Sequence, residues 1–290
     1  MMSKVDLSTS TLFSILLIPL SLVFIHLLPR GIRNILIFNH QDPEVLAAFS
    51  THFVHSSNGH LLGNLFIALT ALVFLSYFFI NLGMEKKFRR CLGISLLGFP
   101  FLISLSEFLI FNAAGITMKN SLGFSAIALA LVGTIPPTLF LYLKETRFEN
   151  LNVADSVPFF HLGLVFILSS YILLWLNSSV ISFGLEIMAV IGVSAVFLFI
   201  YSEYRLLNIV EKKLGLSSED LKQFVSTNEG KIVGMSLLVF VFGAFAVVPS
   251  QIAKDGGMIN IISHMVGFTM GFYTAELFLV KNKTVFSKET

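Results

Sequence analysis

The chain has 290 residues, of which 55% are apolar and 12% are charged. Because water-soluble domains carry about 25% charged residues, this composition excludes an ordinary soluble fold. A net charge of +2, spread along the chain, argues against nucleic acid as a partner, and a single cysteine, Cys91, excludes an intramolecular disulfide.

Long apolar runs divide the chain into candidate membrane spans. A helix needs about 20 mostly apolar residues to cross the hydrocarbon core of a bilayer. We expect one all-α polytopic membrane domain over residues 1–290, with eight transmembrane helices. The runs are approximately 11–28, 59–80, 91–111, 121–143, 157–176, 180–202, 232–249 and 258–280. The first run is predicted to be retained, because no small-residue cleavage site follows it.

The basic residues predict which way these spans point, because cytoplasmic loops of membrane proteins are enriched in Lys and Arg. With a cytoplasmic N-terminus, 15 of the 19 basic residues lie on the inner side, and Arg30, Arg33, Lys119 and Lys254 remain outside. The sequence therefore predicts a multi-pass protein of the cell membrane with both termini in the cytoplasm.

The outer loop 29–58 is long enough for structure of its own. It contains Asp42 followed by Pro43, a pattern typical of a helix N-cap with proline at the first helical position. Apolar residues at helical spacing follow. We expect a short helix here that lies on or in the outer leaflet.

The second span opens with closely spaced polar residues. His60 and Asn64 are four apart, so they share one helix face about one turn below the outer boundary. Each can donate a hydrogen bond to one oxygen atom beside that face; the alternative is a polar clasp between helices. His55 is expected to close the entering turn by bonding to backbone. A zinc site from His52, His55 and His60 is a further alternative, but it lacks a nearby carboxylate or thiolate, so we expect no metal.

The fourth span opens with Gly123, two residues before Ser125, and Ala126 follows the serine. These small neighbours allow close backbone approach around an exposed hydroxyl. The alternative is structural, because a serine in a membrane helix usually bonds the carbonyl of the residue four positions earlier.

The inner segment 203–230 is also more than a turn. Ser217 and Asp220 have the spacing of a capping box before an apolar run. This predicts an amphipathic cytoplasmic hairpin.

The last span contains His264, Gly267 and Gly271. The two glycines form a small-xxx-small face, which lets helices pack closely. His264 is three residues before Gly267, so it lies on the packed face and not towards lipid.

Depth links three of these spans. His60, Ser125 and His264 lie two to seven residues below the outer ends of spans that all run from outside to inside. At 1.5 Å per residue this is a depth of roughly 3 to 10 Å. Independent structural clasps would have no reason to share one level, so the coincidence favours a catalytic site.

At these residues the sequence resembles the rhomboid family of intramembrane serine proteases. The resemblance implies a six-helix core, here with a hairpin inserted between the helices that carry the serine and the last histidine. The matching motifs are His55-x4-His60-x3-Asn64, Gly123-x-Ser125 and His264-x2-Gly267-x3-Gly271.

The resemblance also implies roles for these residues. Ser125 would be the nucleophile and His264 its general base, while His60, Asn64 and the Ser125 N–H would bind the oxyanion. No aspartate lies in a motif context to orient His264, so we expect a dyad that needs no cofactor. The implied substrates are single-pass transmembrane proteins in the lipid bilayer, cut near their outer end.

Two other functions remain open at this point. One is a catalytically inactive rhomboid-like protein that binds and sorts membrane clients. The other is a transporter that relays protons through His and Glu, although transporter sites lie near the midplane. Glu107, near an outer helix end, is expected to face water.

Overall fold

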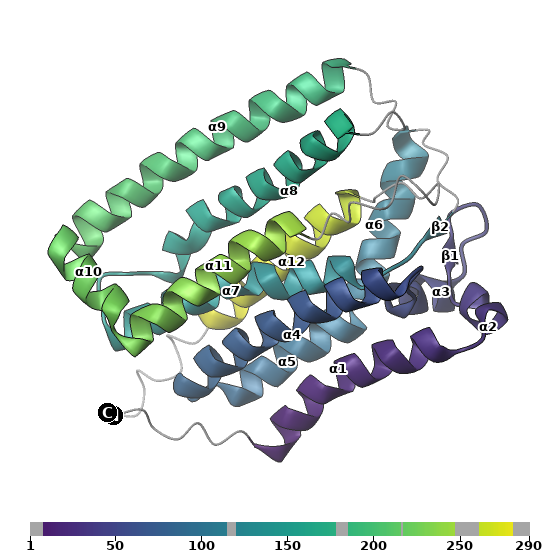
Figure 1. The fold of residues 1–290 in the computed structure, drawn as a ribbon, viewed down its shortest axis with the longest axis horizontal. Coiled ribbons are helices and arrows are strands. Elements are labelled where there is room, and N and C mark those ends of the chain that lie inside the picture. The colour runs from purple at the N-terminus through teal and green to yellow at the C-terminus, as the bar shows by residue number, and fades with distance from the viewer. Residues whose placement is uncertain (1–7, 115–119, 178–184, 216, 247–260, 281–290) are drawn as a thin grey trace.

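The computed structural model describes residues 8–114, 120–177, 185–215, 217–246 and 261–280, which are almost entirely helical (Figure 1). The helices are α1 (Thr9–Leu27), α2 (Arg30–Ile35), α3 (Val45–Ser50), α4 (Asn58–Asn81), α5 (Glu85–Leu97), α6 (Phe99–Ala114), α7 (Ser125–Thr146), α8 (Val157–Asn177), α9 (Leu185–Ile209), α10 (Ser218–Ser226), α11 (Asn228–Ala246) and α12 (Ile261–Val280). Shorter elements are the 3-10 turns η1 (Thr51–Phe53) and η2 (Val153–Ser156), the π-helical turn η3 (Val210–Leu214), and the strands β1 (Phe38–Asn39) and β2 (Asn120–Ser121).

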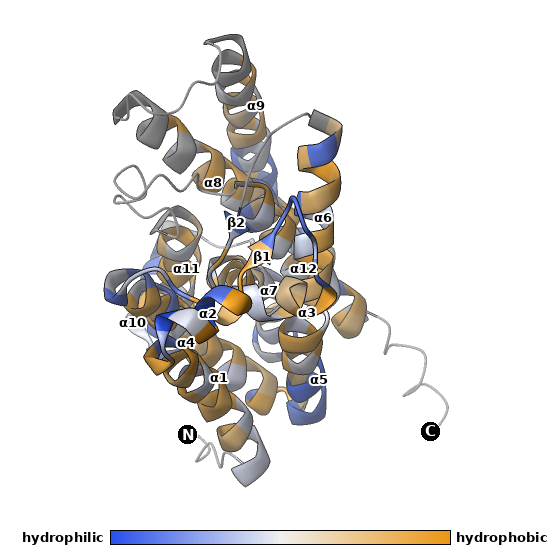
Figure 2. Ribbon diagram, turned by 90° about the vertical axis from the view of Figure 1, so that its right-hand side faces the viewer, coloured by the Kyte–Doolittle hydropathy of each residue, from blue (hydrophilic) through white to orange (hydrophobic). Residues whose placement is uncertain are grey.

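Several of these helices have the apolar outer surface that is typical of membrane-spanning helices. Large apolar side chains point outward from them: Phe13 is 66% exposed, Phe66 is 73% and Phe197 is 69%. Figure 2 shows the helices coloured mostly as hydrophobic. Such outward-facing apolar surface is stable in lipid and not in water. Within the described residues, five helical segments are long and apolar enough to span: Thr9–Leu27, Asn58–Asn81, Glu85–Ala113, Ser125–Thr146 and Gly192–Leu214.

The chain is therefore an all-α polytopic membrane protein. The predicted spans 157–176, 232–249 and 258–280 coincide with α8, α11 and α12 where the structure describes them. Parts of the predicted spans at 180–184, 247–249 and 258–260, and the basic residues near the two termini, lie outside the described residues. Eight crossings and the direction of the termini stay predictions.

The centre of the bundle is α7. All of its residues from Ser125 to Tyr142 are buried. It packs against α4, α11 and α12, and α12 makes the most extensive contact. At the outside, α8 separates α9 from the rest of the bundle, while α1 lies at the opposite edge (Figure 1). Ser125 is thus the first residue of a helix that is buried from its start to Tyr142.

The third predicted span is two helices in the structure. It begins at Glu85, earlier than the predicted 91–111, and it is interrupted at Gly98 between α5 and α6. Pro100 explains the interruption, because proline lacks the N–H that would bond the carbonyl four residues earlier. The bend directs α6 towards β1, β2 and α3 at one end of the bundle (Figure 1).

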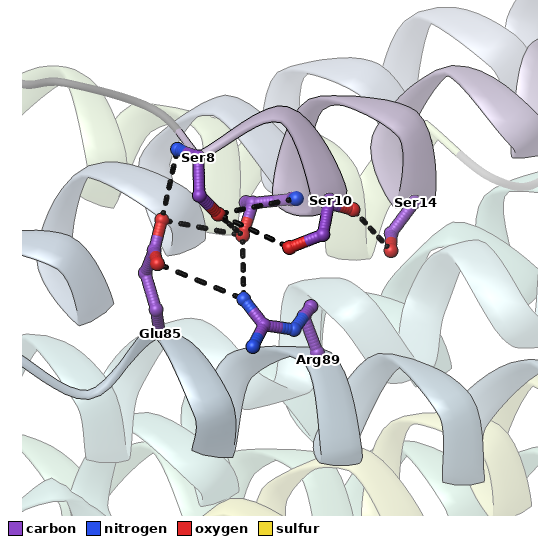
Figure 3. A network of polar contacts seen from close by, with 6 residues as sticks. Ser8, Ser10, Ser14, Glu85 and Arg89 are labelled. Atoms are coloured by element: carbon purple, nitrogen blue, oxygen red, sulfur yellow. Dashed lines mark hydrogen bonds and ion pairs between the residues drawn. The ribbon is translucent and has the colours of Figure 1, made fainter.

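The first helix is attached to α5 by polar contacts at the other end of the bundle (Figure 3). The Ser8 N–H and the Thr11 hydroxyl donate to Glu85 Oε1, at 3.2 Å and 3.3 Å. Arg89 donates to Thr11 Oγ1 at 3.2 Å and lies 3.6 Å from the Glu85 carboxylate. Thr11 is fully buried. These polar contacts attach the first turn of α1 to α5. The outward face of α1 is otherwise apolar.

The outer loop contains the expected short helix, but the predicted cap is wrong. The helix α3 begins at Val45, and Asp42 does not cap it. The reason is a tight turn: the Asn39 side chain accepts from the Gln41 N–H at 3.0 Å, and the Asp42 N–H donates to the Asn39 carbonyl at 3.2 Å. The turn lets β1 pair antiparallel with β2, with Phe38 opposite Ser121.

The segment 203–230 is only partly as predicted. The helix α9 continues to Ile209, and Gly215 in the left-handed conformation (φ 57°) ends the π-helical turn η3. The capping box between Ser217 and Asp220 is present at the start of α10. Lys213 forms a 2.6 Å ion pair with Asp155 of η2, so this segment is anchored to the bundle.

Candidate active site

Ser125 follows a turn that requires glycine. Gly123 has φ +118°, which side-chain-bearing residues rarely adopt. A Cβ atom at this position would lie 2.7 Å from Cε1 of His60. The close neighbour at Gly123 is therefore an imidazole ring. The prediction of an exposed hydroxyl is wrong, since Ser125 is buried.

The outer loop holds this turn in place. The Gly123 N–H donates to the Thr51 carbonyl at 3.1 Å, and the Thr51 hydroxyl donates to the Ser121 carbonyl. Together with the β1–β2 pairing, these bonds fix the path of the chain up to the first residue of α7.

His52 connects the outer loop to α6, a contact that the sequence did not reveal. It is buried, and its Nε2 lies 3.0 Å from the Pro100 carbonyl and 3.0 Å from Ser104 Oγ. The Ser104 hydroxyl donates to the Ala48 carbonyl at 2.8 Å. The local sequence offers one signal, a polar side chain among apolar residues. It could not identify the partners of His52, because Pro100 and Ser104 are far from it in sequence.

Ser125 and His264 are in contact. Ser125 Oγ and His264 Nε2 are 2.8 Å apart, and both side chains are buried. The usual structural bond of a helical serine is absent for a geometric reason: the residue four positions earlier is Ser121, which lies in β2 and outside the helix. Ser106, by contrast, bonds the Leu102 carbonyl of its own helix at 2.8 Å.

Glycines bring the two helices that carry this pair together. A Cβ atom on Gly267 would lie 2.1 Å from the Ala126 carbonyl oxygen, and one on Gly271 would lie 1.9 Å from that of Ala130. Backbone therefore touches backbone along α7 and α12. His264 is about one turn before Gly267 and lies on the same face of α12. The close packing of the two helices therefore places its ring against the first turn of α7.

Among the described residues, neither His60 nor Asn64 forms a hydrogen bond with Ser125 or His264. The His60 ring covers Gly123, and Ser57 caps its helix by accepting from the His60 N–H at 3.2 Å. Asn64 is buried, and its Nδ2 lies 3.0 Å from His55 Nε2. His55 thus bonds to Asn64, a partner that the sequence did not predict.

The protonation of His55 decides how Asn64 is oriented. Burial lowers the pKa of His55 to about 3, so the ring is neutral at physiological pH. Its Nε2 then accepts one N–H of the Asn64 amide. An amide carries two such hydrogens, so one remains for a ligand.

The zinc alternative is not supported. His52 bonds to α6, whereas the rings of His55 and His60 meet edge to face with centroids 5.1 Å apart. Among the residues that the structure describes, no three His, Cys, Asp or Glu side chains form a group that could hold a metal.

The expectation for Glu107 is wrong. Its side chain does not face water, since the residue is only 1% exposed. His40 of the outer loop has its Nε2 3.6 Å from the Glu107 carboxylate and 2.8 Å from Ser121 Oγ of β2, an arrangement that local sequence does not encode.

We predict acid lability from His52. Burial lowers its pKa from 6.5 to about 4. Between these values the unfolded chain binds a proton that the folded chain does not, so stability is complete above pH 6.5 and falls as the pH falls towards 4. The contribution of this one group is on the order of 3 kcal/mol. The melting temperature of the protein in detergent, measured from pH 7 to pH 4, checks it.

The matched comparison uses two variants. His52→Asn should give a flatter pH dependence of the melting temperature than wild type. His26→Asn, at a partly exposed ring, should keep the wild-type slope. Equal slopes in wild type and His52→Asn would contradict the prediction.

Fold and site together define a multi-pass helical membrane protein with a buried serine–imidazole pair. In comparisons with protein-family models, with curated proteins and with solved structures, the chain matches none of them.

Proposed function

We propose that this chain is a rhomboid-type intramembrane serine endopeptidase, with Ser125 as nucleophile and His264 as general base. The observation that carries the proposal is the 2.8 Å contact between Ser125 Oγ and His264 Nε2 at the start of a buried helix. A polar pair inside a membrane bundle is costly and is retained where it has a function. A client-binding protein without activity would not need a serine hydroxyl aligned with an imidazole nitrogen.

The chemistry follows from the two side chains. A serine hydroxyl has a pKa far above 7, so it attacks a peptide carbonyl only when a neighbouring base takes its proton. His264 Nε2 accepts that proton as the Oγ–carbon bond forms, and then gives it to the departing amine as the peptide bond breaks. Water repeats the two steps on the acyl-enzyme and releases the second product.

The oxyanion of each tetrahedral intermediate needs donors that are already in place. The Ser125 N–H is available because it belongs to the first residue of its helix. His60 lies against Gly123, two residues earlier. The remaining N–H of Asn64 is the third donor in this proposal, since the other is bonded to His55.

The helix packing fits a six-helix core with one inserted hairpin. Helix α11 packs against α4 and α7 as well as α8, whereas α9 packs against α8 and η3. We therefore assign α11 to the position of the fifth core helix and α8 with α9 to the insertion. A hairpin adds two crossings, so α12 still enters from the side on which α7 begins.

The distribution of basic residues supports an orientation with the site on the outer side. The cluster that includes Lys86 and Arg90, together with Arg147 and Lys213, lies at the end opposite to Ser125. By the positive-inside rule the site faces the outside of the cell membrane. The substrates in this proposal are single-pass proteins whose transmembrane segment unwinds near its outer end.

Cleavage in proteoliposomes tests the proposal. Wild-type protein should cut a single-pass substrate with helix-breaking residues near its outer end, and the fragment masses should place the cut there. Ser125→Ala should give no fragments. Ser236→Ala is the matched control, because this buried hydroxyl only bonds the Val233 carbonyl of its own helix. Fragments from Ser125→Ala, or none from wild type, would reject the proposal.

Asn64→Ala should slow turnover without abolishing it. Loss of one preorganised donor typically lowers kcat about 100- to 1,000-fold, while the nucleophile stays activated. We expect slow cleavage together with detectable labelling of Ser125 by a fluorophosphonate. Asn81→Ala is the control, since this amide at the other end of α4 bonds the Tyr77 carbonyl. Equal cleavage rates in both variants would refute the role of Asn64.

A further inference from the structure

Thr134 is a buried polar residue of α7 for which the proposed mechanism has no use. It follows Ser125 on the same helix, is 6% exposed, and belongs to a segment apolar enough to span the membrane. Its hydroxyl donates to the Ala130 carbonyl of its own helix at 2.9 Å. This is the ordinary bond of a threonine in a membrane helix, and alone it would have only a structural meaning.

The same hydroxyl also reaches α12. Thr134 Oγ1 donates to the Gly271 carbonyl at 3.2 Å, so its hydrogen is shared between one carbonyl of each helix. A Cβ atom on Gly271 would lie 1.9 Å from the Ala130 carbonyl oxygen. This close approach brings Gly271 within reach of the Thr134 hydroxyl. The bond to α12 therefore depends on where that helix lies along α7.

The two helices are thus joined at two places. Ser125 Oγ and His264 Nε2 are 2.8 Å apart at one of them, and Thr134 meets Gly271 at the other. At 1.5 Å per residue, these places lie about 10 to 14 Å apart along the helices. A single contact would let α12 pivot around it, whereas two separated contacts define both its axial position and its tilt.

Packing alone defines this register only coarsely. Gly267 and Gly271 face Ala126 and Ala130, so both helices present small residues at the same spacing of four. Van der Waals contact between such surfaces lets the helices lie close together, but it has no preferred direction along the helix axis. A hydrogen bond weakens steeply when its angle changes. The Thr134 hydroxyl therefore resists a slide that the small residues would permit.

We propose that Thr134 is a positioning residue, whose hydroxyl bonds Gly271 and so holds α12 in the axial register that the dyad needs. The inference rests on the proposed function and adds a support within the helix pair itself. Thr134 does not touch the reacting atoms.

The test is the rate at which a fluorophosphonate labels Ser125 in purified full-length protein. Thr134→Val keeps the β-branched shape and lacks only the hydroxyl. It should lower the rate about tenfold, since a shift near 1 Å at a catalytic group costs about 100-fold and the slide permitted here is smaller. Thr134→Ser keeps the donor and should label within about threefold of wild type, because the two hydroxyls bond alike.

Thr138→Val is the matched control. Thr138 is fully buried on the same helix, and its hydroxyl donates to the Thr134 carbonyl at 2.9 Å, a bond within α7. Both valine variants lose one buried hydroxyl and one bond within the helix, so their melting temperatures in detergent should change alike. Only Thr134→Val also loses the bond to α12. Thr138→Val should therefore label as wild type does.

Substrate cleavage in proteoliposomes adds a readout that a purely structural role would not give. Thr134→Val should lower kcat and leave KM unchanged, because the residue affects the alignment of the dyad and does not contact the substrate. Unchanged kcat with a raised KM would contradict the inference.

The labelling outcomes separate this inference from the function on which it rests. Wild-type labelling at Ser125 together with a wild-type rate in Thr134→Val would overturn the inference alone. Equal slowing in the two valine variants, or in Thr134→Val and Thr134→Ser, would also overturn it. Absence of labelling in wild type would overturn the proposed function and this inference with it.

Discussion

Replacing His264 with alanine is expected to abolish both substrate cleavage and fluorophosphonate labelling of Ser125. Without the imidazole, Ser125 Oγ loses the only acceptor that the described structure places at hydrogen-bonding distance, 2.8 Å away. Loss of the base in a serine protease costs about 10⁴-fold or more in kcat. Cleavage of a single-pass substrate in proteoliposomes and gel-based labelling both measure the loss.

The control for His264→Ala is a second histidine of the bundle. His161→Ala changes a partly buried imidazole on α8, whose ring packs against Phe160 and Tyr201. It should retain cleavage and labelling. Wild-type activity in His264→Ala, or an equal loss in both variants, would contradict the assignment of the base.

Among single glycine-to-alanine changes at the contact between α7 and α12, Gly271→Ala is expected to cause the largest loss of stability. The added Cβ would lie 1.9 Å from the Ala130 carbonyl oxygen, which belongs to backbone and cannot rotate away. Helices α7 and α12 must separate to make room. Overpacking of this kind costs about 3 kcal/mol, or more where backbone must move. The melting temperature in detergent should fall by several degrees.

The matched control is Gly234→Ala on α11. A Cβ atom there meets nothing within 4 Å, so the change should be neutral or slightly stabilising, because alanine favours the helix by about 1 kcal/mol. Gly271→Ala should also slow labelling of Ser125, since the same contact holds His264 in place. Equal melting temperatures in the two variants would contradict the close packing.

Composition and apolar run length predicted the fold class, because a bilayer requires apolar helices of a minimum length. The predicted run at 59–80 and the observed helix Asn58–Asn81 differ by one residue at each end. The break at Gly98 was missed, although Pro100 signals it locally. Asp42 does not cap α3 because it belongs to a turn that Asn39 closes. The capping pattern and the turn pattern compete for the same residue, and the sequence alone does not show which one forms.

The candidate site, too, was predicted only in part from the sequence. Spacing on one helix placed His264 on the face of Gly267 and Gly271, and the contact with α7 lies on that face. The supports of the site come from other segments. Nothing near Glu107 in sequence indicates that His40 Nε2 lies 3.6 Å from its carboxylate, since this contact arises only when the outer loop meets α6.

The most direct test of the account is the identity of the residue that a fluorophosphonate modifies. Purified wild-type protein and Ser125→Ala are treated with the probe in detergent, digested and analysed by mass spectrometry. We predict an adduct on the peptide that contains Ser125 in wild type and no adduct in the variant. Wild-type protein that carries no adduct, or an adduct that persists in Ser125→Ala, would contradict it.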